Sequence, residues 1–386
     1  MRKPKYLSLI ILIAVQLFFL TGCWNYREID DLGIIAGMTV DKGSTQDSYL
    51  LTFEIVTFSD TGKEAKVEPM IVESEGKTIF DAVRNSIRIS AKKLYWSHVN
   101  IVIVSQEIAE DGILQILDFI NRDAEPREQM HIVISKEKTA KELLKQKSIT
   151  TEIRAFDIEK MMTAKNSLGK APEAKIHDII NMLGGEGISV TLPAVGAIEN
   201  NGEKKPELSG AALFDKEKFI GFLDGDDTKY FLFVKNKIEG GLLTFKENPQ
   251  SAFENVTLEI FNNKTRLTPI YYQGKITMGI DIQTKVSIAE TDFSKNVIDQ
   301  KGRDVLKAKA EDMLRNNIEQ VVKKIQLEFG VDAFGFGSTI KKKKPELWKS
   351  IKGDWHNIYR NMEVSVNVEM DIKASGLISK PIKIGD

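Results

Sequence analysis

The spacing of the apolar residues changes halfway along the chain, and this change constrains the fold more than any other feature. In residues 276–288 and 362–372, apolar side chains occupy every second position and mostly polar ones lie between them. Such alternation is typical of strands with one buried and one wet face, as in antiparallel sheets. Between these segments, residues 304–329 carry apolar side chains three and four positions apart, which predicts a long helix. The C-terminal half is therefore expected to be an antiparallel sheet packed by one long helix, an α+β arrangement.

The N-terminal half has a different pattern. Residues 99–104 and 132–134 are nearly continuous apolar runs rich in β-branched side chains, as expected of strands buried on both faces of a sheet. Residues 106–121, between them, have helical spacing. Strand, helix and strand in this order predict an α/β region with a βαβ unit and two parallel strands. Further strands are predicted at residues 32–40, 49–55 and 188–192. Further helices are predicted at residues 76–91 and in two segments of residues 151–183 that are separated by Gly169-Lys170-Ala171-Pro172.

A polar segment rich in turn-forming residues, 199–206, lies between the two patterns. Because Asn, Gly and Pro favour turns and loops, we interpret it as a linker. It would join an N-terminal α/β region, residues 23–198, to a C-terminal α+β domain, residues 207–377, followed by a tail at residues 378–386. A division of the N-terminal region into two subdomains near residue 150 stays open.

The first 22 residues have the pattern of a lipoprotein signal peptide. Basic residues precede a 15-residue apolar stretch over residues 6–20, and Leu20-Thr21-Gly22-Cys23 follows. That stretch is shorter than the roughly 20 residues that cross a bilayer and suits a signal sequence. A cysteine at the cleavage position predicts that Cys23 becomes the first mature residue, as an N-palmitoyl, S-diacylglycerol cysteine. The alternative is an uncleaved signal anchor in which the cysteine has no role.

The cysteine count and the charge narrow the class further. Cys23 is the one cysteine of the chain, so no intramolecular disulfide can form and the fold must be stabilised by its core. Without residues 1–22, the chain has 51 basic and 55 acidic residues, a formal net charge of −4. This balance argues against nucleic acid as a partner. No later segment has 18 uninterrupted apolar residues, so no transmembrane helix is predicted.

No pattern for catalysis or metal binding emerges from the sequence. The four histidines lack the spacing of metal ligands, and neither a P-loop nor a nucleophile elbow is present; the histidines are His98, His131, His177 and His356. Asp224-Gly225-Asp226-Asp227 resembles the start of a calcium loop, but Lys235 stands where the closing Glu would be. We interpret this segment as a turn and helix N-cap. We therefore predict no metal, no cofactor and no enzymatic activity, which favours a binding or assembly role.

Three features near the C-terminus each have two interpretations. Phe334-Gly335-Phe336-Gly337 follows a helix and not a strand, so a turn with aromatic packing is favoured over a dinucleotide loop. The four lysines at 341–344 form either a solvated segment or a contact with anionic lipid headgroups. Trp348 and Trp355 belong either to a packed core or to an interface.

Several segments together resemble one family, the C-subunit lipoproteins of spore germinant receptors, the Ger(x)C family of endospore-forming bacteria. The segments that carry the resemblance are Cys23-Trp24-Asn25-Tyr26-Arg27-Glu28-Ile29-Asp30, the strand at 33–41, Leu208-Ser209-Gly210-Ala211-Ala212-Leu213-Phe214 with Gly221-Phe222-Leu223, Asp332-Ala333-Phe334-Gly335-Phe336-Gly337, Trp348, Trp355, and a last strand ending near Gly376. One departure is Thr21, where this family more often has Ser or Ala.

The resemblance implies a lipid-anchored, non-enzymatic subunit on the outer face of the spore inner membrane. It implies assembly with polytopic A- and B-type receptor subunits in a complex that senses nutrients and triggers germination. It also implies an elongated arrangement of α/β domains, usually three. The lipidated cysteine is the one functional residue that carries over, onto Cys23. Whether this subunit itself contacts the nutrient stays open.

Two other classes of protein share some of these features. A solute-binding lipoprotein of an uptake transporter would have the same leader and size, but it predicts two similar lobes with parallel sheets. The alternation in residues 276–288 and 362–372 argues against a matching second lobe. An envelope hydrolase would need a nucleophile, a metal or a carboxylate pair converging in a cleft.

Overall fold

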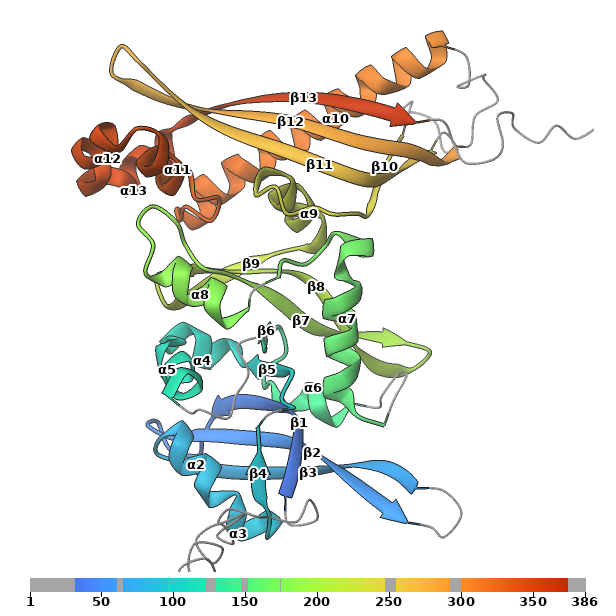
Figure 1. The fold of residues 1–386 in the computed structure, drawn as a ribbon, viewed down its shortest axis with the longest axis vertical. Helices are drawn as coiled ribbons and strands as arrows, with labels where there is room; N and C mark the ends of the chain where they lie inside the picture. Colours follow the sequence, from blue (N-terminus) through green and yellow to red (C-terminus); the bar gives the residue numbers. More distant parts are fainter. Residues whose placement is uncertain are drawn as a thin grey trace, which may run out of the picture.

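The computed structural model describes residues 32–60, 65–96, 98–122, 130–146, 152–173, 175–246, 255–291 and 300–373. These residues form two β-sheets that lie one above the other along the long axis of the molecule (Figure 1). The lower sheet has nine strands, and the upper sheet has four. This arrangement confirms the predicted mixed α/β and α+β fold class.

The nine-stranded sheet is parallel at its centre and antiparallel at both ends. Its strand order is β3-β2-β1-β5-β6-β7-β8-β9, with β4 also paired to β1. Strands β1, β5, β6 and β7 run parallel, whereas β2–β3 and β8–β9 add antiparallel pairs at the two ends. The strands are β1 (Leu32–Lys42), β2 (Tyr49–Asp60), β3 (Ala65–Gly76), β4 (Lys93–Tyr95), β5 (Ile101–Val104), β6 (His131–Ser135), β7 (Thr191–Asn200), β8 (Glu203–Asp215) and β9 (Lys218–Leu223).

Helices cover both faces of this sheet, as the continuous apolar strands require. One face packs against α2, α4, α5 and α8, and the other packs against α6 and α7. The predicted βαβ unit is confirmed, because β5 and β6 are parallel and α4 and α5 connect them. Two predicted helices are interrupted, at Ser86 and at Gly112. The helices are α2 (Ile79–Asn85), α3 (Ile87–Ser90), α4 (Gln106–Asp111), α5 (Leu114–Arg122), α6 (Lys141–Lys145), α7 (Arg154–Leu168) and α8 (Ile176–Leu183).

Two buried carboxylates of the sheet hold the beginnings of helices on its second face. Asp41 of β1 accepts hydrogen bonds from the backbone N–H groups of Ala140 (2.6 Å) and Lys141 (3.0 Å), where α6 begins. Glu54 of β2 accepts from the backbone N–H groups of Arg154 (2.9 Å) and Ala155 (2.7 Å), where α7 begins. Burial raises the pKa of both carboxyls, although these hydrogen bonds oppose the shift. Each carboxylate therefore satisfies helix N–H groups that would otherwise lack an acceptor.

The structure corrects the expectation that residues 199–206 are a linker. They form the end of a hairpin, in which β7 pairs antiparallel with β8 through Asn200↔Glu203. The two residues of the turn, Asn201 (φ 54°) and Gly202 (φ 75°), both have positive φ, as the tightest hairpin turns require. The strand expected at 188–192 begins only at Thr191. The proposed break near residue 150, the leader and the tail at 378–386 lie outside the described residues.

The upper sheet has the order β10-β11-β12-β13, and α10 lies across one of its faces. The predicted alternation and long helix are confirmed, but β13 runs parallel to β12, so the sheet is not wholly antiparallel. The reason is that the 25-residue α10 returns the chain along the sheet before β13 begins. The elements are α9 (Gly225–Val234), β10 (Leu242–Lys246), β11 (Asn255–Tyr272), β12 (Lys275–Thr291), α10 (Gln300–Lys324) with a π-helical turn (Ile325–Phe329), α11 (Phe336–Lys343), α12 (Pro345–Ile351), a 3₁₀ turn (Lys352–Asp354), α13 (Trp355–Asn361) and β13 (Glu363–Lys373).

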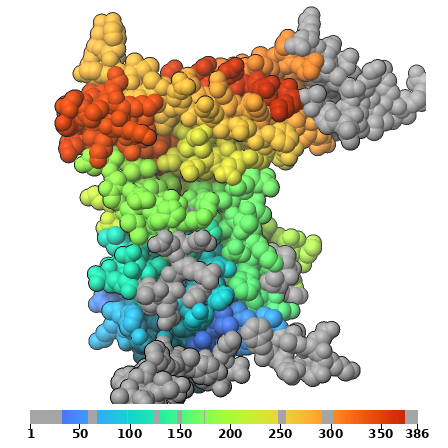
Figure 2. All heavy atoms as spheres, viewed as in Figure 1, coloured from blue at the N-terminus to red at the C-terminus, as the bar shows by residue number. Residues whose placement is uncertain are grey.

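The tip of the β11–β12 hairpin protrudes from the upper sheet, at the upper left of the space-filling view (Figure 2). It carries Tyr271 and Tyr272, which are 51% and 70% exposed. No described helix is long and apolar enough to cross a membrane.

The two sheets share a core through the last strands of the lower one. Along β8 the side chains alternate, so that Ala212 and Phe214 pack in the lower core while Ala211 and Leu213 pack against the upper sheet. The helix α9 lies between the sheets and contributes Phe231 to the upper core (Figure 1). The lower sheet therefore continues into residues that the sequence analysis placed in the C-terminal domain.

Candidate functional site

A cavity of about 370 Å³ lies at the junction of the two parts of the molecule. Its walls come from the end of α7, the loop before α8, α8 itself, the loop after α8 with the start of β7, the end of α9 with the segment after it, and Ser338 of α11. These segments are far apart in the sequence. Only the packing of the upper part on the lower part brings them together.

Two close backbone contacts involving glycines flank this cavity, and we call them the glycine seams. In the first, a Cβ on Gly169 would lie 2.7 Å from the carbonyl oxygen of Gly240. In the second, a Cβ on Gly187 would lie 2.5 Å from the backbone carbon of Gly337, and the backbone N–H of Ser338 donates to the Gly187 carbonyl at 2.8 Å. Because no larger residue fits either seam without a backbone shift, the two parts are held in close contact on both sides.

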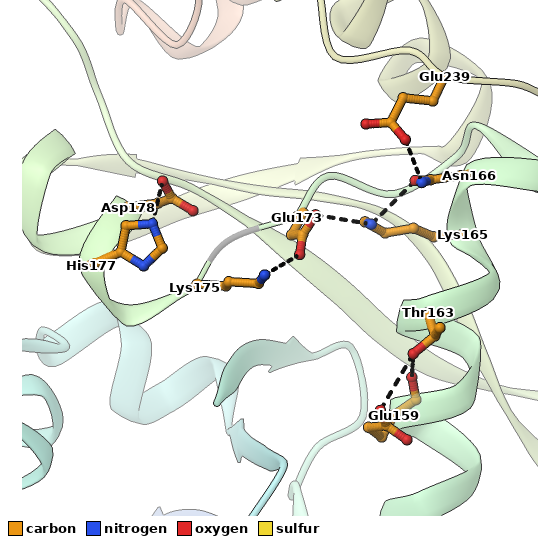
Figure 3. Close-up of polar contacts among 9 residues, drawn as sticks. All are labelled: Glu159, Thr163, Lys165, Asn166, Glu173, Lys175, His177, Asp178 and Glu239. Carbon is orange, nitrogen blue, oxygen red and sulfur yellow. Dashed lines mark hydrogen bonds and ion pairs between the residues drawn. The ribbon is translucent and has the colours of Figure 1, made fainter. Parts of the chain in front are cut away.

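A polar network lines the side of the cavity formed by α7 and α8 (Figure 3). Lys165 of α7 lies 3.1 Å from a carboxylate oxygen of Glu173, and Lys175 lies 3.4 Å from the other. Burial disfavours ionisation of Glu173, yet the two lysines lower its pKa overall. Asn166 donates to Glu239 at 2.5 Å across the junction. These carboxylates are therefore already engaged by donors of the protein.

Of the four histidines, two lie beside this network. His177 lies 3.2 Å from Asp178, in an exposed pair. His131 of β6 is more buried, and its Nδ1 has no hydrogen-bond partner in the described part of the chain. Burial lowers the pKa of His131, with opposing influences from Glu173 and Lys175. Within the described ranges, no group of three His, Cys, Asp or Glu side chains is placed to hold a metal ion.

The opposite side of the cavity carries a lysine that sequence reasoning considered only as a failed calcium ligand. Lys235 directly follows α9, and its ammonium donates to the Phe334 carbonyl at 3.4 Å, a long hydrogen bond. Burial lowers the pKa of Lys235 to about 8; Asp332 opposes this shift and the neighbouring Lys237 adds to it. Among the described residues, no carboxylate forms an ion pair with Lys235 or Lys237.

Asp332 organises the loop that follows the π-helical turn. Its carboxylate accepts backbone N–H bonds from Gly335 (2.8 Å), Phe336 (2.9 Å) and Gly337 (2.8 Å). Burial raises the pKa of Asp332 to about 6, against the pull of these donors and of Lys235. Phe334 and Phe336 stack with their ring centroids 5.1 Å apart. The segment is thus the turn with aromatic packing that the sequence predicted.

One carboxylate of the loop after α8 also joins α11, α12 and the 3₁₀ turn to the lower part. Glu186 accepts from the indole N–H of Trp348 at 2.9 Å and pairs with Lys341 (3.0 Å) and Lys352 (3.4 Å). These hydrogen bonds and charges lower the pKa of Glu186 to about 2. Trp348 is 4% exposed and packs edge-on against Trp355, so the predicted core packing of both tryptophans is confirmed.

The remaining predicted features are placed as follows. Asp224 caps α9, accepting from the Asp227 backbone N–H at 2.8 Å, which confirms the predicted N-cap. The lysines at 341–344 belong to α11 and its end, where Lys343 donates to the Leu267 carbonyl at 2.6 Å. Cys23 lies outside the described residues.

Comparison with known proteins identifies the class of this fold. Residues 25–197 match the model of the spore germination protein N-terminal domain, and residues 209–376 match the model named spore germination B3/GerAC like, C-terminal. The chain belongs to this family of GerAC-like spore germination C-subunits.

Curated relatives and one solved structure agree with this placement. The chain is 26% identical to spore germination protein KC of Bacillus subtilis, over 97% of each chain. It is 24% identical to spore germination protein B3 of the same organism, over 97% of this chain and all of that one. The crystal structure of the GerBC protein has the same fold, with a TM-score of 0.54 and 20% identity, over 87% of this chain and 97% of that chain.

Proposed function

We propose that this chain is a lipid-anchored, non-enzymatic subunit of a nutrient germinant receptor. It is held on the outer face of the spore inner membrane and assembles with polytopic A- and B-type subunits. The observation that carries the proposal is the family match over nearly the whole chain together with Leu20-Thr21-Gly22-Cys23, directly after an apolar leader. Acylation at Cys23 with more than one chain would make the anchor stable, because a single chain binds membranes only marginally.

The position of the first described strand indicates which end of the molecule faces the membrane. Eight residues lie between Cys23 and Leu32, and a chain of that length spans at most about 30 Å. The lower sheet, which contains β1, is therefore the part held near the membrane, and the β11–β12 tip lies at the opposite end (Figure 1). Tethering raises the effective concentration of the protein beside partners in the same membrane.

The buried carboxylates support a role without catalysis. Asp41, Glu54 and Asp332 each accept hydrogen bonds from backbone N–H groups and so hold local structure. These hydrogen bonds give the three carboxylates a structural role, in keeping with a chain that acts through contacts with other molecules.

The alternative, a solute-binding lipoprotein of an uptake transporter, requires two similar lobes. The two described sheets differ in strand number, direction and helix cover, which favours the receptor subunit. An envelope hydrolase would need a nucleophile, a metal or a carboxylate pair converging in a cleft, and in the described part of the chain no three His, Cys, Asp or Glu side chains are placed to hold a metal ion.

Substitution of the predicted lipidated residue tests the proposal. In a strain that lacks this gene, Cys23→Ala should release the protein from the membrane fraction and abolish the nutrient response, because the thiol that accepts the lipid is lost. Asn25→Ala, two residues along, is the matched control and should behave as the natural chain does. Full membrane association and nutrient response of Cys23→Ala would overturn the anchor.

Purification from membranes tests the assembly separately. After crosslinking, polytopic subunits should copurify with the natural chain and be depleted with Cys23→Ala. Mass spectrometry should find acyl groups on Cys23, and an unmodified thiol would contradict the proposal. If the thiol is acylated but no polytopic protein copurifies, the anchor stands and the receptor assembly does not.

A further inference from the structure

We propose that the cavity between α7, α8 and α9 binds a small monocarboxylate with an apolar body, and that Lys235 and Lys237 hold the carboxylate. This goes beyond the proposed receptor role, since it rests on residues between Lys165 and Ser338 and requires neither the anchor nor a membrane partner.

The size and the walls of the cavity suit a small organic molecule. Its volume of about 370 Å³ falls within the range of roughly 300–1,000 Å³ that is usual for such sites. Apolar side chains from both parts of the molecule form much of the wall: Met182, Ile188, Phe231, Leu232 and Ile238. A site of this kind binds an apolar body and uses a few polar groups to orient it.

The charges that line the cavity favour an anionic group at one end. An ammonium group has three donors, and the hydrogen bond that Lys235 makes within the described chain is the long one to Phe334. Asp332 attracts Lys235, but its oxygens already accept three backbone N–H groups. Lys237, an exposed residue that also lines the cavity, adds a second positive charge that repels the first. A carboxylate between the two lysines would satisfy donors and remove this repulsion.

The acidic residues of the cavity wall limit the ligand to one negative charge. Glu173 is neutralised by Lys165 and Lys175, and Glu239 accepts from Asn166. Asp178 and Glu239 also line the cavity, and their negative charges disfavour a second carboxylate on the ligand. Solvent reaches the wall at Asp178 and Glu173, because their side chains are 48% and 39% exposed. A ligand can enter there with its anionic group pointing inward.

The glycine seams fix the distance between the two parts of the molecule that form the cavity walls. Because Gly169 meets Gly240 and Gly187 meets Gly337 in backbone contact, the two walls cannot move closer together at these points. A ligand in the cavity touches both parts of the molecule, so its binding should stabilise their junction against heat.

The test uses the full-length chain in detergent and three probes with the same ring: benzoate, benzamide and benzylamine. Calorimetry should show benzoate binding at least about tenfold more tightly than the neutral and the cationic probe, the effect of one charge-assisted hydrogen bond. Benzoate should also raise the thermal unfolding midpoint. Equal binding of benzamide or benzylamine, or no binding of benzoate, would overturn the proposal.

Variants locate the site. Lys235→Met should weaken benzoate binding by about tenfold or more, whereas Lys285→Met, on the exposed face of β12, should leave it unchanged. Lys235→Met removes a desolvated cation but also its attraction to the buried Asp332, so circular dichroism and thermal unfolding first establish that the variant is folded. If it does not fold, Lys237→Met is measured instead, with the same expectation. Unchanged affinity in the lysine variant that folds, or equal loss in Lys285→Met, would refute the assignment.

Discussion

The two sheets of this protein bury their strands in different ways. In β5 of the lower sheet all four residues are buried, because helices cover both faces. In β13 of the upper sheet, buried and exposed residues alternate, because α10 packs on one face only. β5 and β13 both run parallel to a neighbour. The comparison teaches that alternation in a sequence reports how many faces of a sheet are covered, and not the direction of the strands.

The largest expected effect is the loss of stability when a charged side chain replaces a buried one on either sheet, and it tests this comparison directly. On β5, Val102→Asp and Ile103→Asp should each destabilise the fold by about 4 kcal/mol or more, since adjacent residues face opposite cores and a buried carboxylate lacks partners. On β13, Val368→Asp should be comparably severe, but its exposed neighbour Asn367→Asp should change stability by less than about 0.5 kcal/mol. Urea unfolding measures all four. A tolerated substitution at either β5 position would show that one face of the lower sheet is not sealed.

A smaller effect is expected at the junction between the two parts. Gly187 (φ 68°) and Gly202 (φ 75°) share a left-handed backbone conformation, but a Cβ on Gly202 meets nothing within 4 Å. Gly202→Ala should therefore cost about 1–2 kcal/mol, the penalty of that conformation alone. Gly187→Ala should cost about 3 kcal/mol or more, since its methyl group also meets the backbone of Gly337. The two unfolding free energies are compared in urea. Equal losses of unfolding free energy in the two variants would mean that the backbone at the second glycine seam can shift to accept a methyl group without destabilising the fold.

The smallest effect concerns the charge that joins α11–α12 to the lower part. Glu186→Gln keeps an acceptor for the indole of Trp348 but removes the attraction to Lys341 and Lys352. Because the folded pKa of Glu186 is lowered to about 2 from 4.5, its contribution is present above pH 4.5 and is lost as the pH falls toward 2. Amide hydrogen exchange in α11 and α12 should therefore be modestly faster in the variant at pH 7. The difference should shrink at low pH and in high salt. A difference that persists at pH 2 would contradict this origin.

The hairpin at residues 199–206 shows where local patterns mislead. Asn201-Gly202 signals a turn, and the structure has one there. Turn-forming residues do not show whether the next strand joins the same sheet or begins another domain. That depends on which strand it pairs with. Here β8 pairs back on β7 and also serves the upper core, so the two parts share strands.

The amino-acid sequence by itself determined the main helices and strands of each half, how many faces of each sheet are covered, and the lipoprotein leader pattern. Each of these features depends on residues within a few positions of one another, so the spacing of apolar and polar residues along the chain reveals it. The tertiary structure alone decided the parallel pairing of β13, the partners of Glu186 and the cavity at Lys235. These arise where Lys165, Lys235 and Ser338, distant along the chain, come together, and such contacts follow from packing that no local pattern encodes.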